Sequence, residues 1–113
     1  MAPLPVMLVD FTGKAAGNVV TLNWKTATEI NSDYFAVERS VDLVSFKEIG
    51  RVTSRGSGSS YLLIDPAANK GLNYYRLRQV DKNGSIEYSK IVTVNLAKQY
   101  TVSLSPNPSR GLV

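Results

Sequence analysis

Apolar and polar residues alternate with a period of two along most of this chain, and no stretch shows the 3.6-residue period of an amphipathic helix. The alternation is clearest over residues 18–25, where Val20, Leu22 and Trp24 fall on one side of an extended strand and polar residues fall on the other. Comparable segments predict seven strands, at residues 6–11, 18–25, 34–40, 45–53, 61–64, 72–80 and 86–95.

Turn-forming residues separate these segments. The sixth and seventh are joined by Asp81-Lys82-Asn83-Gly84, and Asn-Gly between alternating strands is the strongest short hairpin signal. Phe46 and Ile49 are three residues apart, so a bulge is needed if both are to face inward. Residues 54–60 offer nothing to bury and predict a flexible loop.

Seven short strands at regular spacing predict an all-β fold, an antiparallel Greek-key sandwich with a fibronectin type III-like or immunoglobulin-like strand order. That order places a buried tryptophan, here Trp24, on the second strand. It also places a tyrosine corner near the start of the sixth strand, here Tyr75. The residues expected in the core are Trp24, Phe35, Val37, Tyr75 and Leu77.

Composition narrows the function classes. The 113 residues suit one domain, and 43% hydrophobic residues suffice for a core. The chain has no cysteine and no histidine, which removes disulfides, thiolate nucleophiles, Ser-His triads and almost every zinc or copper site. The net charge of +4 comes from dispersed residues, without the basic block of a nucleic-acid arm. We therefore expect a monomer that is not an enzyme, binds no cofactor and no nucleic acid, and has no membrane-inserted segment.

Several separated motifs carry a family likeness. Over residues 4–96 the chain resembles the immunoglobulin/fibronectin-like modules that precede the C-terminal sorting domain of proteins exported by the type IX secretion system. The resemblance implies a linker at residues 1–5 and a sandwich module at residues 6–96. It also implies a spacer role between adjacent domains of a secreted or cell-surface bacterial protein. The motifs are Leu4-Pro5-Val6, residues 22–31 (LNWKTATEIN), 34–42 (YFAVERSVD), 73–81 (NYYRLRQVD) and 87–90 (EYSK).

The C-terminal segment resembles the opening of the type IX sorting domain itself. There a short strand runs into a Pro-Asn-Pro turn, here Pro106, Asn107 and Pro108, followed by Gly111. In that family the outer-membrane translocon recognises the sorting domain. The chain ends at Val113, so residues 97–113 are expected to be a linker and a truncated start of that domain. Engagement of the translocon would require a complete sorting domain.

One surface is a candidate binding site. If the third, sixth and seventh strands are neighbours, Tyr34, Tyr74 and Tyr88 share an outward face with Arg76 and Arg78. Flat aromatic rings beside hydrogen-bond donors are suited to stacking against a sugar ring, which makes a carbohydrate-binding module the alternative function. The competing interpretation is that tyrosines are good strand formers that pack against their neighbours or the next domain.

Acidic residues suggest little catalytic or metal chemistry. Residues 28–33 could supply about four oxygen ligands and no glycine turn, fewer ligands than calcium requires, so a turn is the better interpretation. Glu29 with Glu38, or Asp81 with Glu87, could be considered as the acid pair of a glycosidase. A module this small has little room for the cleft that such a pair needs.

Two further interactions are considered. Glu38 is better explained as a cross-strand partner of Arg76 or Arg78 than as a catalytic acid. An isopeptide crosslink from Lys25 or Lys90 to an Asn or Asp side chain is a minor alternative, because the sequence does not place these groups face to face.

Overall fold

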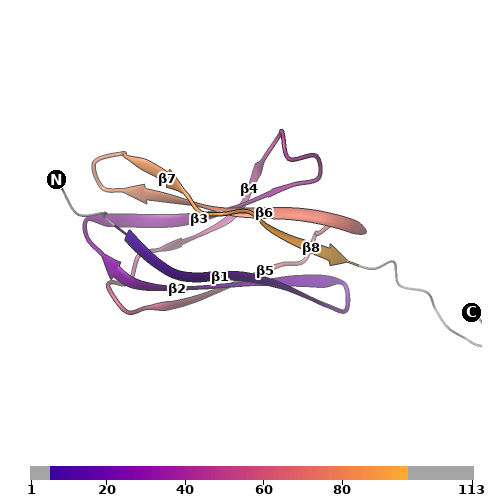
Figure 1. Cartoon of the computed structure of the whole chain (residues 1–113), viewed down its shortest axis with the longest axis horizontal. Coiled ribbons are helices and arrows are strands. Elements are labelled where there is room, and N and C mark those ends of the chain that lie inside the picture. The colour runs from indigo at the N-terminus through magenta and orange to yellow at the C-terminus, as the bar shows by residue number, and fades with distance from the viewer. Residues whose placement is uncertain (1–5, 97–113) are drawn as a thin grey trace, which may run out of the picture.

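The computed structural model describes residues 6–96, which form an all-β sandwich of two antiparallel sheets (Figure 1). Sheet A has the strand order β1-β2-β5. Sheet B has the order β4-β3-β6-β7, and β8 also pairs with β6. The predicted fold class is confirmed. The strands are β1 (Val6–Ala16), β2 (Val19–Glu29), β3 (Ser32–Ser40), β4 (Lys47–Thr53), β5 (Ser60–Asp65), β6 (Gly71–Asp81), β7 (Ile86–Tyr88) and β8 (Val92–Leu96).

The predicted seventh strand, residues 86–95, is split into β7 and β8, so the described residues form eight strands. Both pieces pair with β6, β7 opposite residues 78–80 and β8 opposite residues 71–75. Between them Ser89 replaces part of the ladder: its Oγ accepts a hydrogen bond from the Leu77 amide at 2.8 Å, and its own amide donates to the Leu77 carbonyl at 3.0 Å. This side-chain contact interrupts the strand while leaving the Leu77 backbone groups satisfied.

The first strand is longer than predicted and forms a hairpin with β2. It continues past Phe11 to Ala16, which lies opposite Val19. Gly13 explains why the alternation was missed, because a Cβ at this position would lie 2.7 Å from a side-chain carbon of Val94. Close approach of β8 therefore requires glycine where the pattern would have shown an apolar residue.

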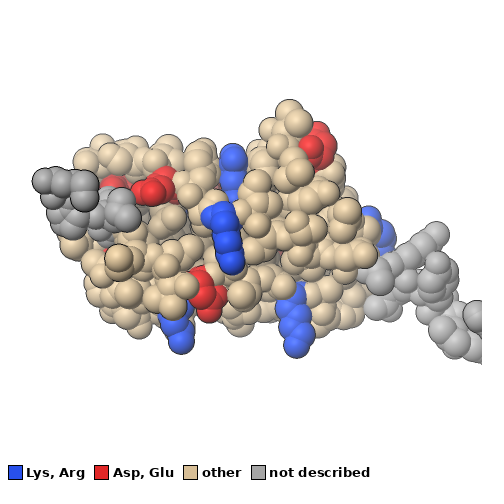
Figure 2. Space-filling model, viewed as in Figure 1, with Lys and Arg blue, Asp and Glu red and all other residues tan. Residues whose placement is uncertain are grey.

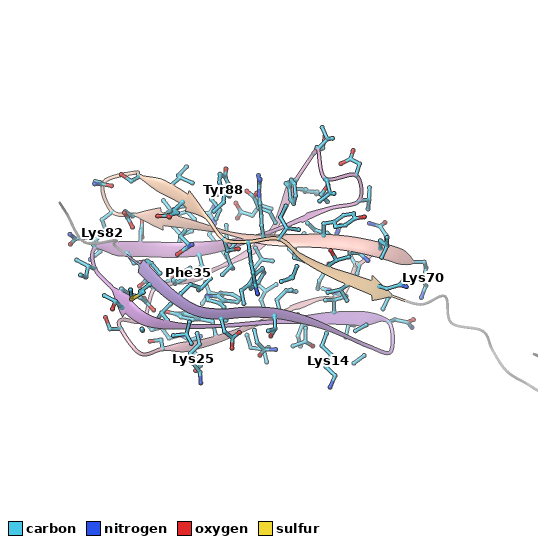
Figure 3. All side chains as sticks on the ribbon, in the orientation of Figure 1. Lys14, Lys25, Phe35, Lys70, Lys82 and Tyr88 are labelled. Atoms are coloured by element: carbon cyan, nitrogen blue, oxygen red, sulfur yellow. The ribbon has the colours of Figure 1, made fainter. Side chains whose placement is uncertain are left out.

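The predicted core residues Trp24, Phe35, Val37, Tyr75 and Leu77 are all buried between the sheets. Trp24 stacks on Tyr61 with ring centroids 5.3 Å apart and planes 8° apart, and it meets Phe35 at 5.9 Å. Figure 3 shows Phe35 between the two layers. These aromatic side chains supply most of the large buried surface that holds sheet A against sheet B.

The hydroxyl of Tyr75 has a different partner from the one a tyrosine corner predicts. It donates to the carboxylate of Asp65 at 2.7 Å, ten residues upstream at the end of β5, rather than to a backbone group. The same carboxylate accepts from Arg39 Nη1 at 2.8 and 2.9 Å. Burial, and then the bond to Asp65, raise the pKa of Tyr75 far above its usual range. The network ties β5 of sheet A to β3 and β6 of sheet B.

The bulge predicted in the fourth strand is present, but only one of the two residues faces inward. The register against β3 shifts between Val37 and Glu38 and leaves Ile49 unpaired in β4. Ile49 packs against the core, whereas Phe46 precedes the strand and contacts Arg76 on the outer side of sheet B. The expectation that Phe46 faces inward is therefore wrong.

The loop of residues 54–60 is anchored, in contrast to the flexible loop predicted. Glu29, at the end of β2, accepts hydrogen bonds from the Ser54 hydroxyl and from the Gly56 amide at 3.1 Å. Its own amide donates to Ser57 Oγ at 2.8 Å. The polar side chains that suggested flexibility are thus the groups that fix the loop.

The two ends of the described chain lie at opposite ends of the sandwich (Figure 1). Val6 pairs with Glu29, at the end that holds the β6–β7 turn and Lys82. Leu96 pairs with Gly71, at the end that holds Lys70 (Figure 3). The chain therefore enters the sandwich at one end of its long axis and leaves at the other.

Candidate functional site

The structure brings the five predicted face residues together on the outer side of sheet B. Arg78 lies opposite Ala36 on one side and opposite Tyr88 on the other, and Arg76 lies opposite Glu38. Tyr34 lies on β3 opposite Val80, which is two residues after Arg78 on β6. Tyr74 lies two residues before Arg76 on β6, opposite Ser40 on one side and Thr93 on the other. Tyr75 and Leu77, which alternate with them on β6, point into the core.

Glu38 is the centre of this face. Its carboxylate accepts from Arg76 Nε at 2.8 Å and from Arg78 Nη1 at 2.9 Å, so it pairs with both arginines considered as partners. The Glu38 side chain is 7% exposed, whereas the two arginine side chains are 26% and 20% exposed. The arginines therefore cover the carboxylate and exclude water from it.

A second acidic residue extends the network to the edge of sheet B. Glu48 on β4 accepts from Arg78 Nη2 at 2.9 Å and from Arg51 through Nε and Nη2 at 2.8 and 2.9 Å. The Arg51 hydrogen bond, with the charges of Arg51 and Arg78, lowers the pKa of Glu48. Arg78 Nη2 also reaches the Tyr34 hydroxyl at 3.4 Å, and this contact helps to raise the pKa of Arg78.

Two of the three tyrosines have a ring face covered by a guanidinium group. The Arg51 Cζ lies 4.1 Å from the Tyr34 ring centroid, and the Arg76 Cζ lies 4.0 Å from that of Tyr88. Tyr88 nevertheless keeps 48% of its surface exposed, and Figure 3 shows it on the outer side of sheet B. The charged and aromatic side chains of this face thus pair with one another, and Tyr88 is the most exposed of its tyrosines.

Sequence reasoning missed three members of this face, Phe46, Glu48 and Arg51. Glu48 and Arg51 carry opposite charges three residues apart across the β4 bulge. Without a bulge, residues three apart in a strand point to opposite faces, so the alternation alone hid this pair. The bulge predicted in this segment is the signal that both can face outward, but the prediction applied it to Phe46 and Ile49 instead.

The other sequence candidates occupy separate places. Thr28 and Glu29 end β2 and Ser32 begins β3, so the turn is limited to residues 30–31, with Asn31 at a φ of 55°. Asp81 is buried opposite Ser32, whereas Glu87 lies opposite Gln79, and neither acid pair considered shares a binding partner. No group of three or more metal-ligating side chains occurs within residues 6–96.

The remaining expectations concern lysines and the C-terminal segment. Lys25 and Lys90 are both exposed, which does not match the shielded setting that an internal crosslink would need. The sorting-signal residues Pro106, Asn107, Pro108 and Gly111 lie outside the described residues. No helix long and apolar enough to cross a membrane is found among the described residues.

Basic residues do not gather into one patch on the side drawn in Figure 2, where lysine and arginine side chains are spread out with acidic ones among them. On the outer face of sheet B three arginines are paired with two glutamates. Such local compensation of charge differs from the uncompensated stripe that a nucleic-acid surface shows.

No family model matches the chain, and no curated protein matches it. Among solved structures, it is similar to a Fn3-like protein from Clostridium thermocellum, with a TM-score of 0.58 and 20% identity over 85% of this chain and 97% of that one. The fold is fibronectin type III-like.

Two pectate lyases also contain a similar fold. Pectate lyase PelI from Erwinia chrysanthemi, in complex with tetragalacturonic acid, matches with a TM-score of 0.57 and 20% identity over 80% of this chain. Pel3 from Pectobacterium carotovorum matches with a TM-score of 0.55 and 21% identity over 91% of this chain. The chain spans only 28% and 27% of these lyase chains, so at this identity the likeness concerns the fold of a module within them.

Proposed function

We propose that this chain is a non-catalytic spacer module of a secreted or surface-attached multidomain bacterial protein. The observation that carries the proposal is the position of Val6 and Leu96 at opposite ends of the sandwich. A module with this geometry holds its two neighbours apart by the length of its strands, roughly 35 Å for an eleven-residue strand.

The outer face of sheet B supports the same proposal. Its arginines are paired with Glu38 and Glu48, and guanidinium groups cover the rings of Tyr34 and Tyr88. A face in which each arginine has an acidic partner needs no ligand for stability. The absence of histidine and cysteine also leaves few side chains suited to nucleophilic or acid–base catalysis.

The type IX assignment rests on the sequence motifs alone and is part of the proposal. In it, a complete sorting domain follows the module and is recognised by the type IX translocon, while the module contacts only the adjacent domains. The chain then acts as a monomer at the cell surface or in the medium.

A replacement experiment tests the spacer role. A reporter is fused to this chain followed by a complete type IX sorting domain, and the fusion is expressed in a bacterium that has the secretion system. Two comparison fusions lack residues 6–96 or carry an unrelated fibronectin type III sandwich of equal length. We expect all three fusions to be exported. Beads coated with an antibody against the reporter should bind the two fusions that contain a sandwich equally well. Loss of bead binding with the unrelated sandwich alone would show that this module supplies more than length.

Polysaccharide binding is the second candidate function. It is favoured by the half-exposed Tyr88 on the outer face of sheet B, beside arginine donors. The occurrence of a similar fold in two pectate lyases adds support, since a polysaccharide-degrading enzyme is a setting in which such a module is found. Affinity electrophoresis of the chain in gels containing soluble polysaccharides tests this function, and unchanged mobility in every gel would reject it.

A further inference from the structure

Arg76 differs from the other arginines of the outer face in how its guanidinium group is held. Its Cζ lies 3.9 Å from the ring centroid of Phe46 and 4.0 Å from that of Tyr88. Each ring attracts the cation through its negative π face, and together the two rings cover the guanidinium from two sides. The group is therefore fixed in orientation before any ligand arrives.

The hydrogen bonds of Arg76 leave part of its donor set open. Within residues 6–96 its side chain makes one hydrogen bond, from Nε to Glu38. The terminal nitrogens Nη1 and Nη2 are not among the buried atoms that lack a partner, and the side chain is 26% exposed. Neither nitrogen has a hydrogen-bond partner among the described residues and neither is fully buried, so both keep contact with solvent.

By contrast, Arg78 uses both of its terminal nitrogens, and Arg51 uses one, in ion pairs within the protein. Arg78 Nη1 and Nη2 bind Glu38 and Glu48, and Arg51 binds Glu48 through Nε and Nη2. Arg76 is thus the arginine of this face with a planar pair of donors left for a ligand. Such a pair matches the two oxygens of a carboxylate.

We propose that Arg76, held between Phe46 and Tyr88, binds the carboxylate of a uronic acid unit in an acidic polysaccharide. This proposal rests on the second candidate function and names its ligand class. A uronic acid carries a carboxylate and an apolar ring face on one sugar. It therefore fits the open edge of Arg76 and the exposed part of the adjoining Tyr88 ring at the same time. An aspartate or glutamate side chain of a peptide offers only the carboxylate.

The electrostatics of the face favour an anionic partner. Its three arginines exceed its two glutamates by one positive charge, although each arginine has an acidic partner. Because that group is held in place by two rings, little side-chain entropy is lost when the carboxylate binds.

The test uses the 113-residue chain in affinity gels containing polygalacturonic acid, its fully methyl-esterified form, a neutral β-glucan or poly-L-glutamate. We expect retardation by polygalacturonic acid and at least about tenfold weaker binding of the methyl ester, whose units have lost the carboxylate charge. Binding is expected to weaken as salt is raised. Equal retardation by the ester would overturn the role of the carboxylate, and equal retardation by poly-L-glutamate would overturn the choice of a polysaccharide.

Variants separate a built site from general attraction of a basic chain to a polyanion. Arg76→Lys keeps the charge but loses the planar donor pair, and Phe46→Ala keeps Arg76 while removing half of the clamp. Both are expected to weaken binding about tenfold. Arg55→Gln is the matched control, because Arg55 also stacks on a tyrosine, Tyr61 at 4.6 Å, but lies in the anchored loop of residues 54–60.

The results distinguish polysaccharide binding in general from recognition of a uronic acid by Arg76. Circular dichroism and thermal melting establish that each variant is folded before its affinity is compared. A loss of binding in Arg55→Gln with no loss in Arg76→Lys would mean that net charge alone binds the polymer and would overturn the site. Retardation by the neutral β-glucan but not by polygalacturonic acid would leave the second candidate function standing and reject the uronate. No retardation by any polysaccharide would reject both.

Discussion

Two glutamates lie at the centres of hydrogen-bond networks in this module, and the two networks use different kinds of donor. Glu38, in the middle of β3, accepts from the guanidinium groups of Arg76 and Arg78 at 2.8 and 2.9 Å. Its negative charge is balanced by these two arginines, which lie on β6, the strand that pairs with β3. The network lies on a flat sheet face and follows directly from the register of β3 against β6.

Glu29, at the end of β2, is held by neutral groups. Its carboxylate accepts from the hydroxyls of Thr26 and Tyr61, each at 2.6 Å, from the Ser54 hydroxyl and from the Gly56 amide at 3.1 Å. No ion pair among the described residues includes it. Burial raises the pKa of Glu29, but the hydrogen bonds outweigh burial and bring the pKa below its ordinary value.

The contrast shows two ways to surround a carboxylate with hydrogen-bond donors in a β-sandwich. Glu38 relies on opposite charge supplied by a neighbouring strand. Glu29 relies on donors collected from a loop, so the loop and the charge stabilise each other. Losing Glu38 leaves Arg76 without an acidic partner and Arg78 with Glu48 alone, whereas losing Glu29 frees a loop. The first loss is expected to cost more.

The largest effect is expected for Glu38→Ala, which should lower the free energy of unfolding by about 3 kcal/mol, because Arg76 loses its acidic partner and Arg78 loses one of two. Urea denaturation measures this change. Glu87→Ala is the control, since Glu87 is exposed on the neighbouring β7 and should cost less than about 0.5 kcal/mol. Similar losses in the two variants would mean that the Glu38 network contributes little.

A smaller loss, about 1–2 kcal/mol, is expected for Glu29→Gln, because an amide cannot accept all the donors that converge on the carboxylate. Hydrogen exchange should show faster exchange of the Gly56 amide. Retained protection of that amide would show that other contacts hold the loop of residues 54–60.

The Glu29 network also predicts a pH dependence. The folded-state pKa of Glu29 is lowered, so its stabilisation is present above the unfolded-state pKa and is lost as pH falls through the folded-state pKa. The difference in stability between the wild type and Glu29→Gln should therefore shrink in acid. Ser57→Ala is the matched control: it removes the acceptor of the Glu29 amide, which does not titrate, so its effect should stay constant with pH.

The smallest effect, of opposite sign, is expected for a carboxylate with neither kind of network. Asp81 is buried, and no ion pair between described residues includes it. Burial raises its pKa, so its contribution favours folding at low pH and is lost as pH rises through the folded-state pKa. Asp81→Asn should therefore raise stability at pH 7 by up to about 1 kcal/mol and have no effect at pH 3. Thermal melting at the two pH values checks this, and a loss at pH 7 would contradict it.

Much of sheet B could be predicted from the sequence because the side on which a strand residue lies follows from its position in the alternating pattern. Alternation on the third and sixth segments placed Phe35 and Leu77 inward, and it made Glu38 a cross-strand partner of Arg76 or Arg78. The clamp around Arg76 could not be predicted, because Phe46 reaches it from outside a strand, and alternation gives no direction to a residue in a connection.

The sequence by itself determined the period-two pattern, the aromatic core around Trp24 and hence the sandwich, because these depend on the burial of neighbouring residues in strands. Only the tertiary structure decided that Asp65 joins Arg39 and Tyr75, and that Glu29 gathers the loop of residues 54–60. These contacts link residues 10 to 32 positions apart, across two sheets or through glycines with positive φ such as Gly56. Polar groups that look solvated in a sequence become bonded only when the fold brings their partners within reach.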